Sequence, residues 1–228
     1  VWNTDSTDVV PFIVEEYEAN EDFTVWTFKL REDVYFSDGE QLTASDVKFT
    51  ADFMTAPDIL LTAFNHINEA YGPILGFDER RNGEADELVG VQVIDDFTFE
   101  YTLSAPNPRM YSQMYGTYIF PEHAIDFEPS EYEATDWWYN QERQVGSGPF
   151  TVARFQRDEF IELVPNQYYF KGAPRLDRLV NRYFPDETAA VLALVAGEID
   201  FSYVSPDVFP TLDPDRFDIL AGNSYVSV

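Results

Sequence analysis

The residues with side chains suited to acid–base or metal chemistry are few and poorly spaced for it. The two histidines, His66 and His123, do not stand in a zinc-type spacing such as His-Glu-x-x-His. The adjacent acids Asp95 and Asp96 would point to opposite faces of a strand and suit a hairpin turn better than the facing carboxylate pair of a glycosidase. The chain has no cysteine, which excludes thiolate ligands, Cys nucleophiles and disulfides. The sequence therefore predicts no catalytic residue, no metal site and no cofactor.

A glycine-rich stretch is the other candidate for chemistry. Gly146, Ser147 and Gly148 have the composition of a phosphate loop, but they precede a predicted strand instead of a helix. Pro149 also lacks the amide hydrogen that such a loop would donate. We therefore interpret residues 144–149 as a linker between a first unit, residues 1–145, and a second unit, residues 146–228.

The first unit should mix helices and strands. Alternating hydrophobicity predicts a strand over residues 24–30, with Trp26, Phe28 and Leu30 on its buried face. Residues 43–46 have the form of a capping box and predict a helix that ends before Pro57, followed by a weaker helix over 60–70. Residues 78–87 predict an exposed loop, and the β-rich runs 89–94 and 97–103 predict a hairpin.

The second unit should contain a βαβ arrangement. Residues 150–155, 160–164 and 179–184 predict strands, and a helix follows with Asp186 as its N-cap and Gly197 at its C-terminal end. A last strand is expected over residues 198–201. A βαβ unit builds parallel sheet and places ligands beyond the carboxyl ends of its strands. This rule favours residues 202–205, including Tyr203 and Ser205, as ligand contacts.

Aromatic residues are the remaining candidates for binding. The chain has 20 Phe, 14 Tyr and 4 Trp, and most of these rings should lie in the core. A tyrosine in a loop instead offers stacking area and a hydroxyl group that forms hydrogen bonds. The aromatic residues that fall in or beside predicted loops are Tyr111, Tyr115, Tyr118, Trp137, Trp138, Tyr139 and Tyr203.

Charge narrows the choice of partners. Forty-two acids against 14 basic residues give a net charge of −28, which disfavours nucleic acid and anionic membrane surfaces. A hydrophobic fraction of 45% argues against disorder. Only three basic residues are lysine, and an acidic, lysine-poor surface suits concentrated salt, so we expect a halophile's protein, with an ordinary acidic protein as the alternative. The sequence contains no run of about 18 apolar residues, so it predicts no membrane span.

Several stretches together resemble a known family. They are residues 26–47 (WTFKLREDVYFSDGEQLTASDV), 91–100 (VQVIDDFTFE), 146–150 (GSGPF), 166–169 (NQYY), 172–177 (GAPRLD), 185–187 (PDE) and 197–200 (GEID). These stretches are similar to the signatures of the family 5 extracellular solute-binding proteins. That family comprises the dipeptide-, oligopeptide- and nickel-binding components of ABC importers. The resemblance covers nearly all of the chain.

The resemblance implies an α/β fold of the mixed α+β kind. It would be a periplasmic-binding-protein-like class II lobe with the additional family subdomain and with the second lobe missing. Residues 1–145 would form the additional subdomain (domain Ib-like), and residues 146–228 would form part of the lobe-one α/β core (domain Ia-like). Because family members are much longer than this chain, we expect it to be an excerpt of a longer protein.

The resemblance also implies a function without chemistry. The protein would be an extracytoplasmic receptor, in the first place for peptides, that delivers its ligand to ABC transporter permease subunits. It would lie outside the cell or at the cell surface, touching the membrane only through a lipid anchor absent from this chain. Tyr203, with Ser205 beside it, would contact ligand. The face contributed by the subdomain would comprise Asn65, His66, Tyr115 and Tyr118.

Other functions remain open at this point. Within the same family, the ligand would be an oligosaccharide or a nickel complex instead of a peptide. From other classes, a secreted hydrolase would use two carboxylates facing each other across a cleft, and an adhesion module would bind without closing on a ligand.

Overall fold

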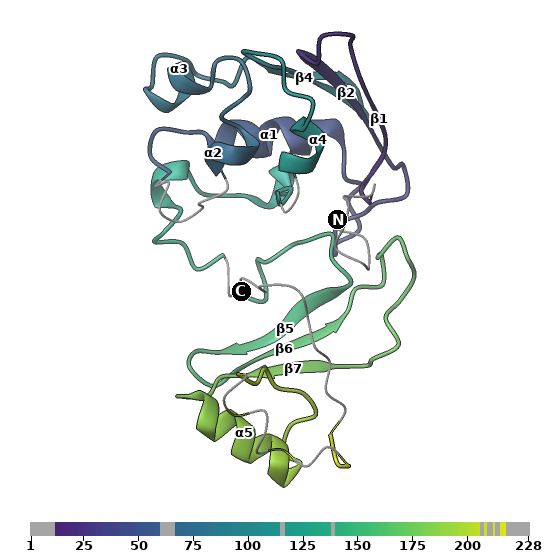
Figure 1. Cartoon of the computed structure of the whole chain (residues 1–228), viewed down its shortest axis with the longest axis vertical. Coiled ribbons are helices and arrows are strands. Elements are labelled where there is room, and N and C mark those ends of the chain that lie inside the picture. Colours follow the sequence, from purple (N-terminus) through teal and green to yellow (C-terminus); the bar gives the residue numbers. More distant parts are fainter. Residues whose placement is uncertain are drawn as a thin grey trace.

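The structure is a computed structural model that describes residues 12–59, 67–114, 117–137, 140–205, 208, 212 and 215–217. Figure 1 shows its elements in two groups, one above the other. The upper group holds β1 (Val14–Ala19), β2 (Val25–Leu30), α1 (Ala44–Met54), α2 (Ile67–Ala70), α3 (Phe77–Arg81), β3 (Val91–Asp95), β4 (Thr98–Thr102) and α4 (Met110–Gln113). The lower group holds β5 (Phe150–Gln156), β6 (Phe160–Pro165), β7 (Leu179–Arg182) and α5 (Glu187–Ala196).

The first sheet has the order β1-β2-β4-β3 and is antiparallel throughout. The alternation that predicts β2 is confirmed, because Trp26, Phe28 and Leu30 are all buried while Lys29 is exposed. In the register of β2 and β4, Phe28 stands opposite Phe99, and their rings stack with centroids 5.1 Å apart. The predicted hairpin is also confirmed, as β3 and β4.

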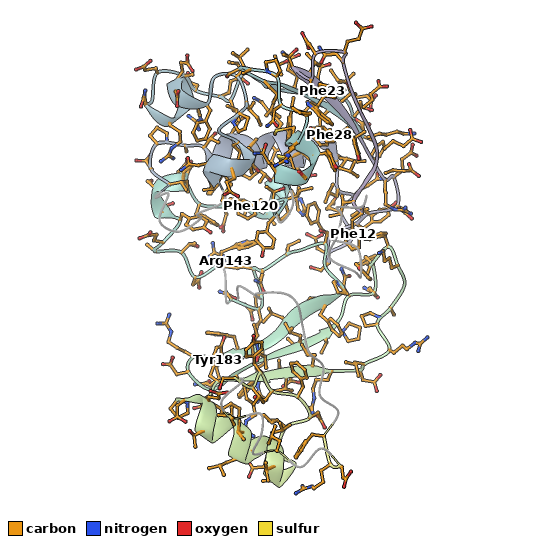
Figure 2. All side chains as sticks on the ribbon, in the orientation of Figure 1. Phe12, Phe23, Phe28, Phe120, Arg143 and Tyr183 are labelled. Carbon is orange, nitrogen blue, oxygen red and sulfur yellow. The ribbon has the colours of Figure 1, made fainter. Side chains whose placement is uncertain are left out.

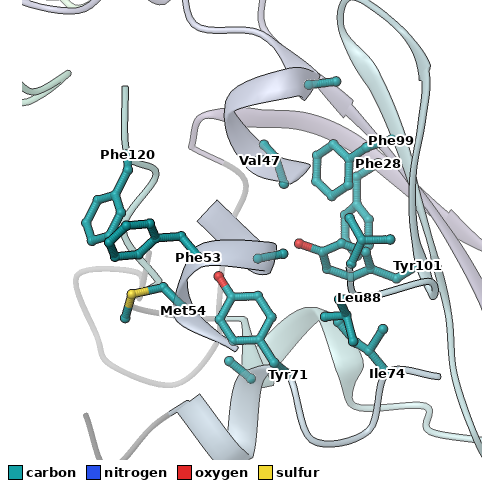
Figure 3. Packing of buried hydrophobic residues seen from close by; sticks show 14 of the residues in the cluster. Phe28, Val47, Phe53, Met54, Tyr71, Ile74, Leu88, Phe99, Tyr101 and Phe120 are labelled. Carbon is teal, nitrogen blue, oxygen red and sulfur yellow. The ribbon is translucent and has the colours of Figure 1, made fainter. Parts of the chain in front are cut away.

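The hydrophobic core lies between this sheet and α1. Figure 3 shows Phe28, Phe99 and Tyr101 of the sheet near Val47 of α1, with Phe53 of α1 beside Phe120. Almost every fully buried apolar side chain belongs to this cluster. In the described part of the second unit, the buried apolar side chains are Val191, Ala193 and Leu212, and each of these is still 7–9% exposed.

Local capping explains where α1 begins. The amide and hydroxyl of Thr43 both donate to Asp46 Oδ2, at 2.8 and 3.2 Å, which confirms the predicted N-terminus. The other oxygen, Oδ1, accepts the amide of Glu122 at 3.0 Å, so the same carboxylate attaches the 3₁₀ turn Glu122–Ala124 to α1. The helix ends at Met54, before Pro57 as expected. Of the weaker helix predicted over 60–70, α2 is the described part, and residues 60–66 lie outside the described residues.

The segment 78–87, predicted as an exposed loop, contains the short helix α3. Its two arginines reach backbone carbonyls around the end of α1: Arg80 donates to Asp52 O and Arg81 to Ile59 O, both at 3.0 Å. These contacts with a distant segment hold one turn of helix that local polarity does not predict.

The second sheet has the order β5-β6-β7 and is also antiparallel. The predicted helix is confirmed as α5. Asp186 accepts the amide of Ala189 at 2.8 Å, and Gly197 adopts φ +76° at the C-terminal end. The side chains on the outer side of this unit remain solvent-exposed, since all four residues of β7 are exposed and Leu192 of α5 is 64% exposed.

The prediction of a βαβ unit is wrong for the described chain. Residues 198–201 form no strand, and every strand pair that the structure describes is antiparallel. The amide of Glu198 instead donates to Ala193 O at 2.9 Å, and the amide of Gly197 donates to Leu194 O at 3.0 Å. The chain therefore wraps around the C-terminal end of α5, whereas a strand would require it to extend away from the helix.

Among the described helices, none is both long and apolar enough to cross a bilayer.

Candidate functional site

Tyr203 and Ser205 lie on the irregular segment that follows α5. The Tyr203 side chain is 72% exposed, and Phe201 beside it is 77% exposed. The segment is attached to the start of α5, because the amide of Ser205 donates to the Glu187 carboxylate. No strand directly precedes this segment, but it still presents an exposed tyrosine ring and is fixed at one end.

Tyr118 is the most exposed of the aromatic side chains that the structure describes in the first unit. Its side chain is 70% exposed. Two residues later Phe120 is buried, and its amide donates to the hydroxyl of Thr50 at 2.8 Å. On the other side, the Thr117 hydroxyl donates to Met114 O, also at 2.8 Å. The chain is thus anchored before and after Tyr118, which leaves this ring at the surface on a held backbone.

The predicted contacts that the structure describes belong to two different units. Tyr118 belongs to the first unit and Tyr203 to the second, and in the described part of the chain no ring contact or hydrogen bond joins them. The other three predicted contacts, Asn65, His66 and Tyr115, lie outside the described residues. Two of the predicted contacts are therefore exposed tyrosines, Tyr118 on the first unit and Tyr203 on the second.

The first unit has a surface hollow that the sequence does not predict, and one side of it is formed by α1. It has a volume of about 620 Å³, and its lining includes Lys48, Asp52, Phe53 and Arg80. Lys48 contacts the carboxylates of Asp52 at 3.2 Å and Glu87 at 2.9 Å. The hydrogen bond from Lys48 lowers the pKa of Glu87. In the sequence, the i, i+4 spacing of Lys48 and Asp52 is the one signal for their ion pair. The ion pair of Lys48 with Glu87 holds α1 to the segment before β3.

The ionisable groups in the core are unsuited to catalysis. Burial raises the pKa values of Tyr71 and Tyr101, so both phenols stay neutral and cannot act as bases near neutral pH. Burial also raises the pKa of Tyr169. Among the residues that the structure describes, no three acidic or histidine side chains come close enough together to hold a metal ion. The arrangement suits noncovalent binding through aromatic rings.

Comparison with known proteins assigns this arrangement to a class. Residues 8–224 match the family described as bacterial extracellular solute-binding proteins, family 5 Middle. The match covers most of the chain, so the chain belongs to this family of solute-binding proteins, which are not enzymes.

Individual relatives agree with the family. A putative ABC transporter peptide-binding protein of Brucella ovis is 29% identical over 235 residues, which is 99% of this chain and 39% of that protein. The periplasmic oligopeptide-binding protein OppA of Salmonella typhimurium is 31% identical over 85% of this chain and 35% of its own length. The chain thus spans well under half the length of these relatives.

A solved structure supports the fold. The OppA of Haemophilus influenzae, crystallised in complex with the peptide RPPGFSPFR, superimposes with a TM-score of 0.73 and 25% identity. The superposition covers 91% of this chain and 40% of that one. The mixed α/β architecture of the described residues therefore corresponds to part of an oligopeptide-binding protein.

Proposed function

We propose that the chain is part of an extracytoplasmic receptor that binds peptides and delivers them to the permease subunits of an ABC importer. The observation that carries this proposal is the chain-long similarity to a peptide-binding relative, 29% identity over 99% of the chain. The exposed tyrosines add chemical support, because an aromatic ring contacts peptide side chains of many kinds without selecting one by charge. Tyr118 and Tyr203 are the proposed contacts on the two units.

The same proposal gives each unit a place in the receptor. Residues 1–145 are the additional subdomain of the family, and residues 146–228 are part of the α/β core of lobe one. This division is supported by the two separate sheets and by the concentration of the core in the first unit. The exposed apolar residues of β7 and α5, among them Val180 and Leu192, are the face that the rest of the receptor covers.

Habitat and location belong to this proposal as well. We place the receptor at the cell surface, held by a lipid anchor, in an organism that lives in concentrated salt. The support for the last point is the net charge of −28 with only three lysines.

Calorimetry on the full-length receptor tests the proposal. Separate titrations with a mixture of short peptides, with oligosaccharides and with Ni²⁺ should give heat of binding for the peptides alone. Heat from the sugar or the metal instead would change the ligand class. Absence of heat in all three titrations would contradict a receptor for any of these solutes.

A tyrosine variant tests the proposed contact. Replacing Tyr203 by Ala should weaken peptide binding by about tenfold, since an aromatic contact contributes about 0.5–1.5 kcal/mol beyond its buried area. Tyr183→Ala is the matched control, because Tyr183 is 51% exposed on the same unit and lies before α5, outside the proposed contact segment. Equal affinities of the two variants would remove Tyr203 from the site.

A further inference from the structure

The turn at residues 36–39 makes contacts with parts of the chain far away in sequence. Within the turn, the amide of Gly39 donates to Phe36 O at 3.0 Å, and Gly39 adopts φ +98°. Its anchor is Phe36, which is fully buried in the core of the first unit. Ser37 and Gly39 are half-buried and Asp38 is exposed, so the turn projects from the core of the first unit.

The backbone of this turn is paired with the linker between the units. The amide of Ser37 donates to Gly146 O at 2.9 Å, and the amide of Gly146 approaches Ser37 Oγ at 3.4 Å. Because Gly146 lies in the linker that leads into β5, this pair fixes where the second unit leaves the first.

Tyr168 from the loop between β6 and β7 lies over Gly39. A Cβ atom built on Gly39 would stand 3.2 Å from Cζ and 3.3 Å from Oη of that ring, closer than carbon atoms pack at their optimum of about 3.5–4.0 Å. Tyr168 is itself held, since its amide donates to Asn166 Oδ1 at 2.9 Å. Asn166 is buried and donates through its own side chain to Gly148 O at 2.9 Å.

Further contacts lie around the same meeting point, some of them within the first unit. Asp38 Oδ2 lies 2.7 Å from His123 Nε2, and the His123 ring meets Phe36 edge-on at 5.6 Å. A little further along the loop, the Arg31 guanidinium lies over the Phe170 ring at 5.2 Å. Figure 2 shows Phe12, whose ring meets Phe170 at 5.1 Å, at the level where the two groups of elements join.

We propose that these residues form a joint that holds the second unit in one orientation on the first. The joint consists of Ser37, Asp38, Gly39, His123, Gly146 and Tyr168. Units linked by a short connection move relative to each other unless a sufficient interface fixes them. Here the fixing contact is a ring that lies on a glycine, where an added Cβ would crowd the ring and would also be strained by the positive φ. If the proposed function holds, the joint also sets the separation between Tyr118 and Tyr203.

Distance measurement by electron paramagnetic resonance tests the joint without any ligand. The chain has no cysteine, so Gln92→Cys in β3 and Glu159→Cys near β6, both at exposed positions, take nitroxide labels at these two sites only. The parent should give a single narrow distance distribution. Gly39→Ala and Tyr168→Ala should each lose it and give a broad or shifted one.

The matched control is Gly83→Ala. Gly83 also has a positive φ, +73°, but its added Cβ would meet only Pro57 Cγ at 3.5 Å, far from the joint. It carries similar backbone strain, so its distribution should remain that of the parent. Tyr168→Ala leaves every backbone angle permissible and is decisive if Gly39→Ala fails to fold. A parent-like distribution in folded Tyr168→Ala, checked by circular dichroism, would overturn the proposal. Failure of peptide binding in the full-length receptor would leave this result unaffected.

Discussion

One hydroxyl group fixes the position of the exposed Tyr118. Thr50 Oγ1 donates to Asp46 O at 2.7 Å and accepts the amide of Phe120 at 2.8 Å, and Thr50 is 2% exposed. Since Phe120 is buried against the core, the bond determines where the preceding residues reach the surface. The candidate ligand contact on the first unit therefore depends on a buried hydroxyl group of α1.

Replacing Thr50 by Val should destabilise the chain by about 1–3 kcal/mol, because the buried amide of Phe120 loses its acceptor. The matched control is Thr55→Val. Thr55 is equally buried, but its hydroxyl donates only to Ala51 O at 2.6 Å, and that carbonyl also accepts the amide of Thr55. Urea unfolding should show a clearly smaller loss for Thr55→Val. Equal losses would contradict the assigned role of Thr50.

Asp33 provides a pH-dependent test at the same scale. Arg31 donates two hydrogen bonds to its carboxylate, from Nε at 2.8 Å and Nη2 at 2.7 Å, and this lowers the pKa of Asp33. A lowered folded pKa means that the pair contributes to stability above the ordinary aspartate pKa, and that the contribution is lost as the pH falls through the lowered value. Asp33 is half-exposed, so the effect on stability is small.

The titration itself is the measurement for this pair. Carboxyl ¹³C shifts of Asp33 should give a midpoint below the ordinary value of about 3.9. In Arg31→Gln the midpoint should return toward that value, whereas Arg109→Gln, which alters an exposed residue elsewhere, should leave it in place. An unchanged Asp33 midpoint in Arg31→Gln would show that the pair does not form in solution.

At the scale of elements, the two long helices begin with carboxylates that do different work. Asp186 caps α5 with one bond to Ala189, at an exposed position. Asp46 accepts from Thr43 and also from the amide of Glu122, and it is 5% exposed. One carboxylate caps the start of a helix, while the other also joins α1 to the 3₁₀ turn Glu122–Ala124.

Replacing these aspartates by alanine should separate the two roles. Asp186→Ala should cost about 1 kcal/mol, the usual cost of losing an N-cap. Asp46→Ala should cost more, because it also leaves the amide of Glu122 without an acceptor, a further loss of about 1–3 kcal/mol. Circular dichroism during urea unfolding measures both. A larger loss for Asp186→Ala would contradict this account of the fold.

The elements that the sequence predicts well are those determined by their own residues. The alternation of Trp26, Phe28 and Leu30, the Thr43–Asp46 cap and the Asp186 cap are all local signals, and each is confirmed. The failures arise from distant contacts or competing ones. Helix α3 depends on carbonyls near the end of α1, and the expected strand at 198–201 loses its first amide to the C-terminal wrap of α5.

The same limit applies to the site. Exposed tyrosines in loops are a sequence-level signal, and both Tyr118 and Tyr203 are indeed exposed. The meeting of Gly39, Gly146 and Tyr168 has no such signal, because the residues come from separate segments that only the folded chain brings together. The Ser-Asp-Gly sequence at 37–39 predicts a turn, but nothing in it indicates what the turn contacts.

At the scale of the whole molecule, charge is the dominant feature. A net charge of −28 on 228 residues creates self-repulsion that opposes the compact state. Salt reduces this repulsion, since the Debye length falls from about 10 Å at 0.1 M to about 3 Å at 1 M. Screening of this repulsion is what the proposed adaptation to concentrated salt would require of the solvent.

The melting temperature should therefore rise as KCl increases from 0.1 to 2 M, as measured by circular dichroism. Sorbitol at matched osmolality is the control, because it changes water activity without screening charge. A larger stabilisation by sorbitol than by KCl would show that repulsion is not what limits stability, and it would count against an adaptation to salt.

The central claim is that this chain belongs to a receptor for peptides. The most direct test is mass spectrometry of the ligand released from the full-length receptor after purification. The account predicts short peptides, bound in one-to-one proportion with the protein. An oligosaccharide or a nickel complex released in that proportion would contradict it.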